Sequence, residues 1–203
     1  MIAIVDYGVG NLFSLKSSLA MIGAEAIVTG DAARLRAAEK IILPGVGAFE
    51  DAANKLRDSG LDQVVTGQAQ AGKPLLGICL GMQLLFERSF EYGEHAGLGL
   101  LKGDMVEMRL HIPAELKVPQ IGWNALIFKQ PEHPLFRYIH EGDCVYFVHS
   151  YYATHCEDST LATTEYGAEL TAAVSRGNIF GCQFHPEKSG KVGLSILKAF
   201  CEI

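Results

Sequence analysis

The sequence contains no apolar run near the ~18 consecutive residues needed to span a membrane, so we expect no membrane-embedded segment. Basic residues are few: 17 Lys and Arg stand against 23 Asp and Glu, and no basic block is present. Nucleic-acid-binding proteins cluster Lys and Arg to neutralise phosphates, so this balance argues against such a partner. The first residues, MIAIVDYG, lack the basic region and apolar length of a signal peptide. We therefore expect a cytoplasmic protein.

Cysteine and histidine patterns that bind metals or form disulfide frameworks are also missing. The five cysteines are an odd number without a C-x-x-C, and the seven histidines include no H-E-x-x-H. Neither a disulfide framework nor a zinc ribbon is predicted. The string HCED at 155–158 contains several potential ligands, but consecutive side chains rarely converge on one ion. We expect a loop there, no metal site and no cofactor.

Apolar runs bounded by turn residues alternate with amphipathic runs through the first half of the chain. Asn11 is expected to cap the first helix. The runs predict strands at 2–8, 24–30, 40–47 and 74–79, and helices at 12–22, 48–58, 61–71 and 80–87. Strands and helices that alternate over short connections form a parallel sheet covered on both faces, so this half predicts an α/β fold.

The pattern changes after about residue 98, where short strand-like runs are separated by turns. These runs lie at 99–110, 121–128, 143–153, 159–167, 170–177 and 178–187, and a final helix is expected at 190–203. The second half therefore adds antiparallel strands. No repeat or flexible linker separates the halves, and 203 residues suit one domain, so residues 1–203 are predicted to form a single domain.

Cys79 lies between two glycines, in Gly77-Ile78-Cys79-Leu80-Gly81, where a predicted strand gives way to a predicted helix. This spacing matches an elbow that raises a nucleophile out of a sharp strand-to-helix turn. The following helix directs its positive end at the sulfur and favours the thiolate, and the Leu80 N–H is placed to bind an oxyanion. Alternatively, Cys79 is an inert core residue whose glycines only permit close packing. The short spacing supports both interpretations equally.

A thiolate nucleophile in acyl chemistry needs a base and a group that orients the base. Candidates lie far downstream in GCQFHPEKS, where Glu187 follows His185 by two residues. In an extended segment these two side chains point the same way, so the carboxylate can hold the imidazole. A surface pair in a strand-end turn is the alternative.

Two glycine-rich strings bear on ligand binding. LPGVGAF, at 43–49, is a glycine turn at the end of a predicted parallel strand, and it could supply a second oxyanion donor near Val46 or Gly47. DYGVGN, at 6–11, begins like a dinucleotide fingerprint, but the third glycine position falls on Phe13. We expect no nucleotide there.

GICLGMQ, FHPE and the PGVG turn together resemble the class I (triad) glutamine amidotransferases, over nearly the whole chain. More narrowly, DYGVGNL, LPGVGAF, PQIGWN, FVHSYY and QFHPEKS resemble the family of glutaminase subunits of imidazole glycerol phosphate synthase. The resemblance implies a flavodoxin-like parallel or mixed sheet flanked by helices, with added antiparallel strands in the C-terminal half. It also implies hydrolysis of L-glutamine to glutamate and ammonia through a cysteine thioester. The ammonia would pass to a (β/α)₈-barrel cyclase subunit in histidine biosynthesis.

The same resemblance implies roles for individual residues. Cys79 would attack the glutamine carboxamide, His185 would shuttle the proton, and Glu187 would orient His185. A peptide of the Gly45–Gly47 turn would rotate before it can donate to the oxyanion. Oxyanion and substrate contacts are expected at Val46, Gly47, Leu80, Gln83, His149, Ser150 and Tyr151, and partner contacts at Trp123, Asn124, Tyr146 and Lys188.

Three functions stay open at this point. The chain is a glutaminase subunit that feeds a partner, a free-standing thiol hydrolase on a similar fold, or a non-catalytic interaction module. Intact Cys79, His185 and Glu187 count against the third. A different amidotransferase partner, such as that of anthranilate synthesis, also stays open. Trp123 has no triad role and favours an interface, although a tryptophan that anchors a turn to the core is the alternative.

Overall fold

A computed structural model describes residues 1–203, and its main element is an eight-stranded sheet. Its strands are β1 (Ile2–Val5), β2 (Ala26–Thr29), β3 (Lys40–Gly45), β4 (Leu75–Cys79), β9 (Ile127–Phe128), β12 (Thr160–Glu165), β13 (Glu169–Arg176) and β14 (Ile179–Cys182). They lie in the order β2-β1-β3-β4-β14-β13-β12-β9. The first five are parallel, in a flavodoxin-like order, and the last three continue antiparallel. The predicted fold class is confirmed.

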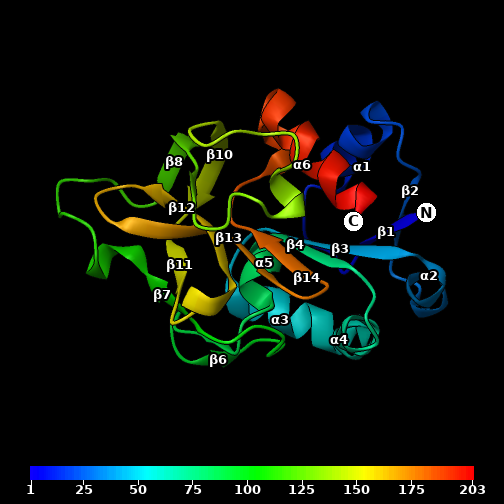
Figure 1. The fold of residues 1–203 in the computed structure, drawn as a ribbon. Coiled ribbons are helices and arrows are strands. Elements are labelled where there is room, and N and C mark those ends of the chain that lie inside the picture. The colour runs from blue at the N-terminus through cyan, green and yellow to red at the C-terminus, as the bar shows by residue number, and fades with distance from the viewer.

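Helices cover both faces of the parallel strands (Figure 1). One face carries α1 (Leu12–Met21) and α6 (Gly190–Glu202), and the other carries α2 (Ala32–Ala37), α3 (Phe49–Asp58) and α4 (Leu61–Gln70). Successive residues of β1 divide between the two faces: Ile4 packs in the core beneath α1 and α6, and Val5 in the core beneath α2–α4. Burial on both faces explains why the parallel strands are continuous apolar runs.

Two smaller sheets lie beside the antiparallel end of the main sheet. One pairs β8 (Gln120–Ala125) with β10 (Cys144–His149). The other has the order β11-β7-β5-β6, formed by β5 (Arg88–Ser89), β6 (His95–Ala96), β7 (Asp104–Glu107) and β11 (Tyr151–Thr154). β5, β6 and α2 were not expected from the sequence. Strands of two residues are too short to carry an alternating pattern.

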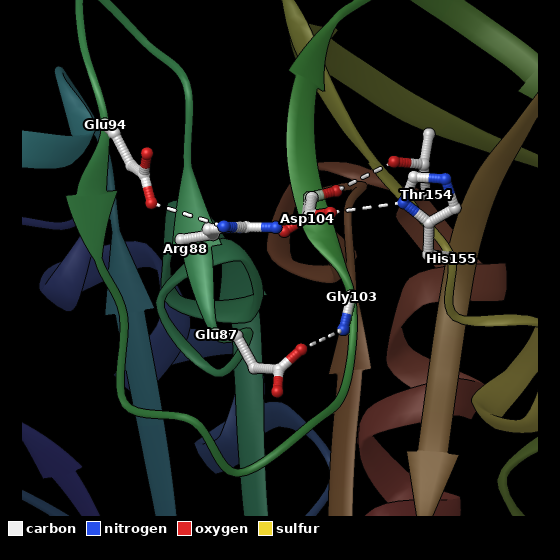
Figure 2. A network of polar contacts seen from close by, with 7 residues as sticks. All are labelled: Glu87, Arg88, Glu94, Gly103, Asp104, Thr154 and His155. Carbon is white, nitrogen blue, oxygen red and sulfur yellow. Dashed lines mark hydrogen bonds and ion pairs between the residues drawn. The ribbon is translucent and has the colours of Figure 1, made fainter.

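A polar network joins the strands of the four-stranded sheet (Figure 2). Arg88 on β5 bonds Asp104 on β7 at 2.5 Å and Glu94 at 3.3 Å, and Asp104 also contacts His155 after β11 at 3.1 Å. The Arg88 guanidinium is the main cause that lowers the pKa of Asp104. The network therefore links β5 and β7 to the segment after β11, although an ion pair as exposed as Arg88–Glu94 contributes at most about 1 kcal/mol.

Two local expectations were wrong. The helix expected at 80–87 ends early, as α5 (Leu80–Leu84), because residues 97–101 donate backbone hydrogen bonds to the carbonyls of residues 84–87. Asn11 precedes α1 but its side chain makes no capping bond and reaches toward Glu187 instead, at 3.5 Å. The longest helix, α6, has 13 residues, and none has the length and apolar content to cross a bilayer.

Candidate active site

The elbow around Cys79 is built by close packing of α5 against β3 and β4. Cys79 ends β4 with φ +54°, a conformation that side-chain-bearing residues rarely adopt. A Cβ on Gly81 would lie 1.8 Å from the carbonyl oxygen of Leu43, and one on Gly77 would lie 2.7 Å from the Gly81 carbonyl oxygen. Only glycine fits at both positions. The strained backbone and the first turn of α5 place the sulfur at the end of the parallel strands, where such sheets bind ligands.

His185 lies opposite Cys79 and is held by Glu187. The His185 Nδ1 atom is 2.8 Å from Glu187 Oε1, and both side chains are only 3% exposed. The segment is not extended as expected, because Pro186–Lys188 forms a 3₁₀ turn, and this turn brings Glu187 back to the imidazole. The His185 N–H donates to the Tyr146 carbonyl, and the Ser189 hydroxyl donates to the His185 carbonyl. Both sides of the histidine backbone are therefore fixed.

The charge state of His185 is set by its two partners. Burial alone would lower the pKa of this histidine, but its hydrogen bonds and charge interactions with Cys79 and Glu187 outweigh burial and raise the pKa to about 9. The imidazole is therefore protonated at neutral pH, facing the sulfur on one side and a carboxylate on the other. A thiolate–imidazolium pair is the reactive form of a cysteine nucleophile.

A cavity of about 270 Å³ opens in front of the sulfur. Its walls contain every substrate and oxyanion residue expected from the sequence, together with the nucleophile and base. The lining residues are Val46, Gly47, Cys79, Leu80, Gln83, Glu91, Pro119, Val148, His149, Ser150, Tyr151 and His185. Glu187 is absent from this wall because it lies behind His185. The cavity thus joins six segments distant in sequence: the β3 turn, the elbow, the loop after β5, the residue before β8, the β10–β11 connection and the segment after β14.

The backbone turn after β3 forms one wall of this cavity. Gly47 has φ +94°, which favours glycine, and Val46 is exposed. The amides of Val46 and Gly47 donate no hydrogen bond within the chain, so they are free to bind an anion. Leu80 is the first residue of α5, so its backbone N–H lies at the start of the helix, next to Cys79. The arrangement provides two places from which N–H groups can stabilise a developing oxyanion.

His149 holds the β10–β11 connection and does not act as a second acid. It is buried, and burial lowers its pKa to about 4, so the ring is neutral near pH 7. Nδ1 lies 2.8 Å from the Tyr151 carbonyl oxygen and Nε2 lies 2.9 Å from Gln120 Oε1. A neutral imidazole has one N–H and can donate to only one of them. These contacts fix the backbone at Ser150 and Tyr151, where it borders the cavity.

The comparisons with known proteins agree with this geometry. The sequence model described as Glutamine amidotransferase class-I matches residues 3–202. The chain is 49% identical to imidazole glycerol phosphate synthase subunit HisH of Caldanaerobacter subterraneus subsp. tengcongensis, over 100% of this chain and 98% of that protein. It is 50% identical to the same subunit of Oceanobacillus iheyensis, over 100% and 99%. The chain belongs to the HisH family of class-I glutamine amidotransferases.

Solved structures support the fold of this HisH family member. A crystal structure of a glutamine amidotransferase superposes with a TM-score of 0.77 at 20% identity, covering 100% of this chain and 98% of that one. PurLQS from Thermotoga maritima gives a TM-score of 0.75 at 21% identity, covering 99% and 97%. At this identity the likeness concerns the fold alone.

Sequence reasoning missed three polar side chains at the site of this amidotransferase. Glu91 lines the cavity and accepts a 2.6 Å hydrogen bond from the Phe49 N–H at the start of α3. Gln183 is fully buried beside the sulfur, and Asn11 reaches Glu187. Glu91 lies in a loop and carried no sequence signal. Gln183 stands inside the GCQFHPE string but was predicted only as part of a strand.

The expected partner residues separate into a cluster and an outlier. Trp123 is 54% exposed on β8, so it is not a core anchor, and its ring packs edge-on against Tyr146, with centroids 5.9 Å apart. The Lys188 ammonium lies 5.7 Å from the Tyr146 ring centroid. The side chain of Asn124 lies on the opposite face of β8 from Trp123, where it contacts Gln120 and the Glu165 carbonyl. We call Trp123, Tyr146 and Lys188 the aromatic–lysine cluster.

Proposed function

We propose that this chain is the glutaminase subunit of an imidazole glycerol phosphate synthase. It hydrolyses glutamine to glutamate and ammonia and supplies the ammonia to a cyclase subunit in histidine biosynthesis. Two observations carry the proposal. The chain is about 50% identical to HisH subunits over its entire length, and it retains Cys79 and His185 in the wall of one cavity with Glu187 bonded to His185 behind it.

The chemistry follows from the contact between Cys79 and the protonated His185. The Cys79 thiolate attacks the carboxamide carbon, and the developing oxyanion accepts hydrogen bonds from the Leu80 N–H and from the Val46–Gly47 turn. His185 gives its proton to the leaving ammonia as the C–N bond breaks, which leaves a γ-glutamyl thioester. Neutral His185 then takes a proton from water as the water attacks the thioester. Glutamate leaves, and the thiolate–imidazolium pair is restored.

The cavity also explains how glutamine is selected. Glu91 is the only carboxylate in its wall, so its negative charge suits the substrate's α-ammonium group. Its hydrogen bond from Phe49 ties this recognition to the start of α3, immediately beyond the oxyanion turn. Gln83 and the backbone at Ser150 and Tyr151 complete the contacts around the bound amino acid.

The partner is a (β/α)₈-barrel cyclase that docks on the aromatic–lysine cluster. An exposed tryptophan packed on a tyrosine is the kind of anchor that dominates interface energies. The Tyr146 carbonyl accepts the His185 N–H at 2.9 Å, and Lys188 follows Glu187 directly, so contact with this cluster acts on the backbone that positions the base. If the competent conformation of the oxyanion turn is populated at ~1% in the free chain, the partner must bind that conformation several kcal/mol more tightly than the other to make it the major one. An interface supplies binding energy of this size.

The test is glutaminase activity of the purified chain with and without the cyclase and its nucleotide ligand. Trp123→Ala should weaken the stimulation by the cyclase while Cys79 can still be labelled by a reactive glutamine analogue. Tyr138→Ala, at another exposed aromatic residue, should leave the stimulation unchanged. Full activity of the isolated chain, unaffected by the cyclase, would instead identify a free-standing thiol hydrolase.

A further inference from the structure

Gln183 forms a direct link between the nucleophile and Gln83. It follows β14, and none of its surface is exposed. Its Nε2 lies 3.7 Å from the Cys79 sulfur, and its Oε1 accepts a 3.0 Å hydrogen bond from Gln83 Nε2. Gln183 does not line the cavity, so it does not touch a bound substrate. Nothing in the mechanism above uses it.

The direction of this hydrogen-bond chain is fixed by its far end. The Gln83 amide donates to two oxygens, the Tyr151 carbonyl at 3.3 Å and Gln183 Oε1 at 3.0 Å. Both N–H groups of Gln83 are therefore used, and its Oε1 is the atom left for substrate. Because Gln183 Oε1 is occupied by Gln83, the Gln183 NH₂ group must point toward the sulfur.

We propose that Gln183 is a positioning residue that stabilises the Cys79 thiolate and holds Gln83 with its amide oxygen available to substrate. An N–H of the fully buried Gln183 amide that points at a thiolate makes a charge-assisted hydrogen bond, and low local dielectric strengthens such a bond. Gln83 consequently recognises a donor on glutamine, an N–H of the carboxamide or of the α-ammonium group. Recognition by Gln83 and activation of Cys79 then share one buried amide.

The substrate half of this proposal rests on the glutaminase function, whereas the thiolate half does not. The decisive measurement is the rate at which iodoacetamide alkylates Cys79 as a function of pH, followed on the Cys79 peptide by mass spectrometry. Cys144 is exposed in the same chain and serves as an internal reference. A failure of the chain to hydrolyse glutamine would overturn the function but leave this measurement intact.

Gln183→Met keeps the length of the side chain and removes both polar atoms. Loss of a hydrogen bond to a charged group should destabilise the Cys79 thiolate, which is the form that is alkylated. Alkylation of Cys79 at neutral pH should therefore slow by about 10- to 100-fold, and the rate should recover at higher pH. Cys144 alkylation should not change. In the complex with the cyclase, KM for glutamine should also rise, because the Gln83 amide is no longer held in one orientation.

The matched control is Asn178→Leu, which removes two 2.8 Å hydrogen bonds from a side-chain amide to the Ala69 and Lys73 carbonyls, remote from the sulfur. This variant should lose stability and keep wild-type alkylation at Cys79. If Gln183→Met does not fold, Gln83→Leu replaces it, since it releases the Gln183 amide and should slow alkylation several-fold. An unchanged rate and pH dependence at Cys79 in the folded variant would overturn the proposal.

Discussion

Replacing Glu187 by glutamine tests whether the carboxylate acts through its charge. Glu187→Gln keeps an oxygen that can accept the 2.8 Å hydrogen bond from His185 Nδ1, but removes the negative charge. Both side chains are almost fully buried, so water screens the loss poorly. Hydrogen bonds involving a charged group contribute about 1.5–3 kcal/mol and neutral ones about 0.5–1.5. The difference of about 1–2 kcal/mol corresponds to a fall in kcat of about 5- to 30-fold.

The same substitution should move the pH dependence in a defined direction. Glu187 helps to raise the pKa of His185 to about 9, so its loss lowers this pKa. The imidazolium that protonates the leaving ammonia then disappears at a lower pH, and the alkaline limb of the kcat profile moves toward neutrality. His185→Asn removes the proton donor itself and should cost more, about 10²–10⁴-fold.

The assay is glutamate release by the cyclase complex across neutral and alkaline pH. Glu157→Gln, which neutralises an exposed carboxylate in a 3₁₀ turn, is the matched control and should leave both kcat and the alkaline limb in place. A Glu187→Gln enzyme with wild-type kcat and an unmoved limb would refute the orienting role. A loss as large as that of His185→Asn would refute the calculation, since it would mean that Glu187 does more than hold the base.

Two further predictions concern stability. Gly81→Ala places a Cβ 1.8 Å from the Leu43 carbonyl oxygen and should cost about 3 kcal/mol or more, whereas Gly67→Ala in α4 meets open space and should gain about 0.5–1 kcal/mol. Equal urea midpoints for the two variants would contradict the packing of the elbow. The second concerns pH. The folded-state pKa of His185 is raised to about 9, so the free energy of unfolding falls by up to about 3 kcal/mol as pH rises from 6.5 to about 9. The folded-state pKa of His149 is lowered to about 4, so the free energy of unfolding falls by up to about 3 kcal/mol as pH drops from 6.5 to about 4. His185→Asn should flatten the alkaline side and His149→Gln the acidic side of a plot of unfolding free energy against pH.

Local patterns were sufficient for much of the fold. The strands expected at 24–30, 40–47 and 74–79 are β2, β3 and β4, and the helices expected at 48–58 and 61–71 are α3 and α4. Failures occurred where distant segments compete for the backbone. The helix after Cys79 stops at Leu84 because the N–H groups of residues 97–101 bond to the carbonyls of residues 84–87. The apolar periodicity of the helix itself cannot predict hydrogen bonds from such a distant segment.

The alternation of apolar strands and amphipathic helices determined the parallel sheet, since the apolar pattern of each segment specifies which of its faces is buried. Gly77 and Gly81 determined the elbow, because a strand-to-helix turn this tight admits only glycine two residues before and two residues after the nucleophile. Only the tertiary structure decided that the His185 imidazole would meet the Cys79 sulfur, and that Glu91 and Gln183 would join them. Those contacts join chain segments far apart in sequence, so their geometry depends on how whole elements pack. The pKa of His185 depends on the same packing, because burial lowers it while the nearby Cys79 and Glu187 both raise it.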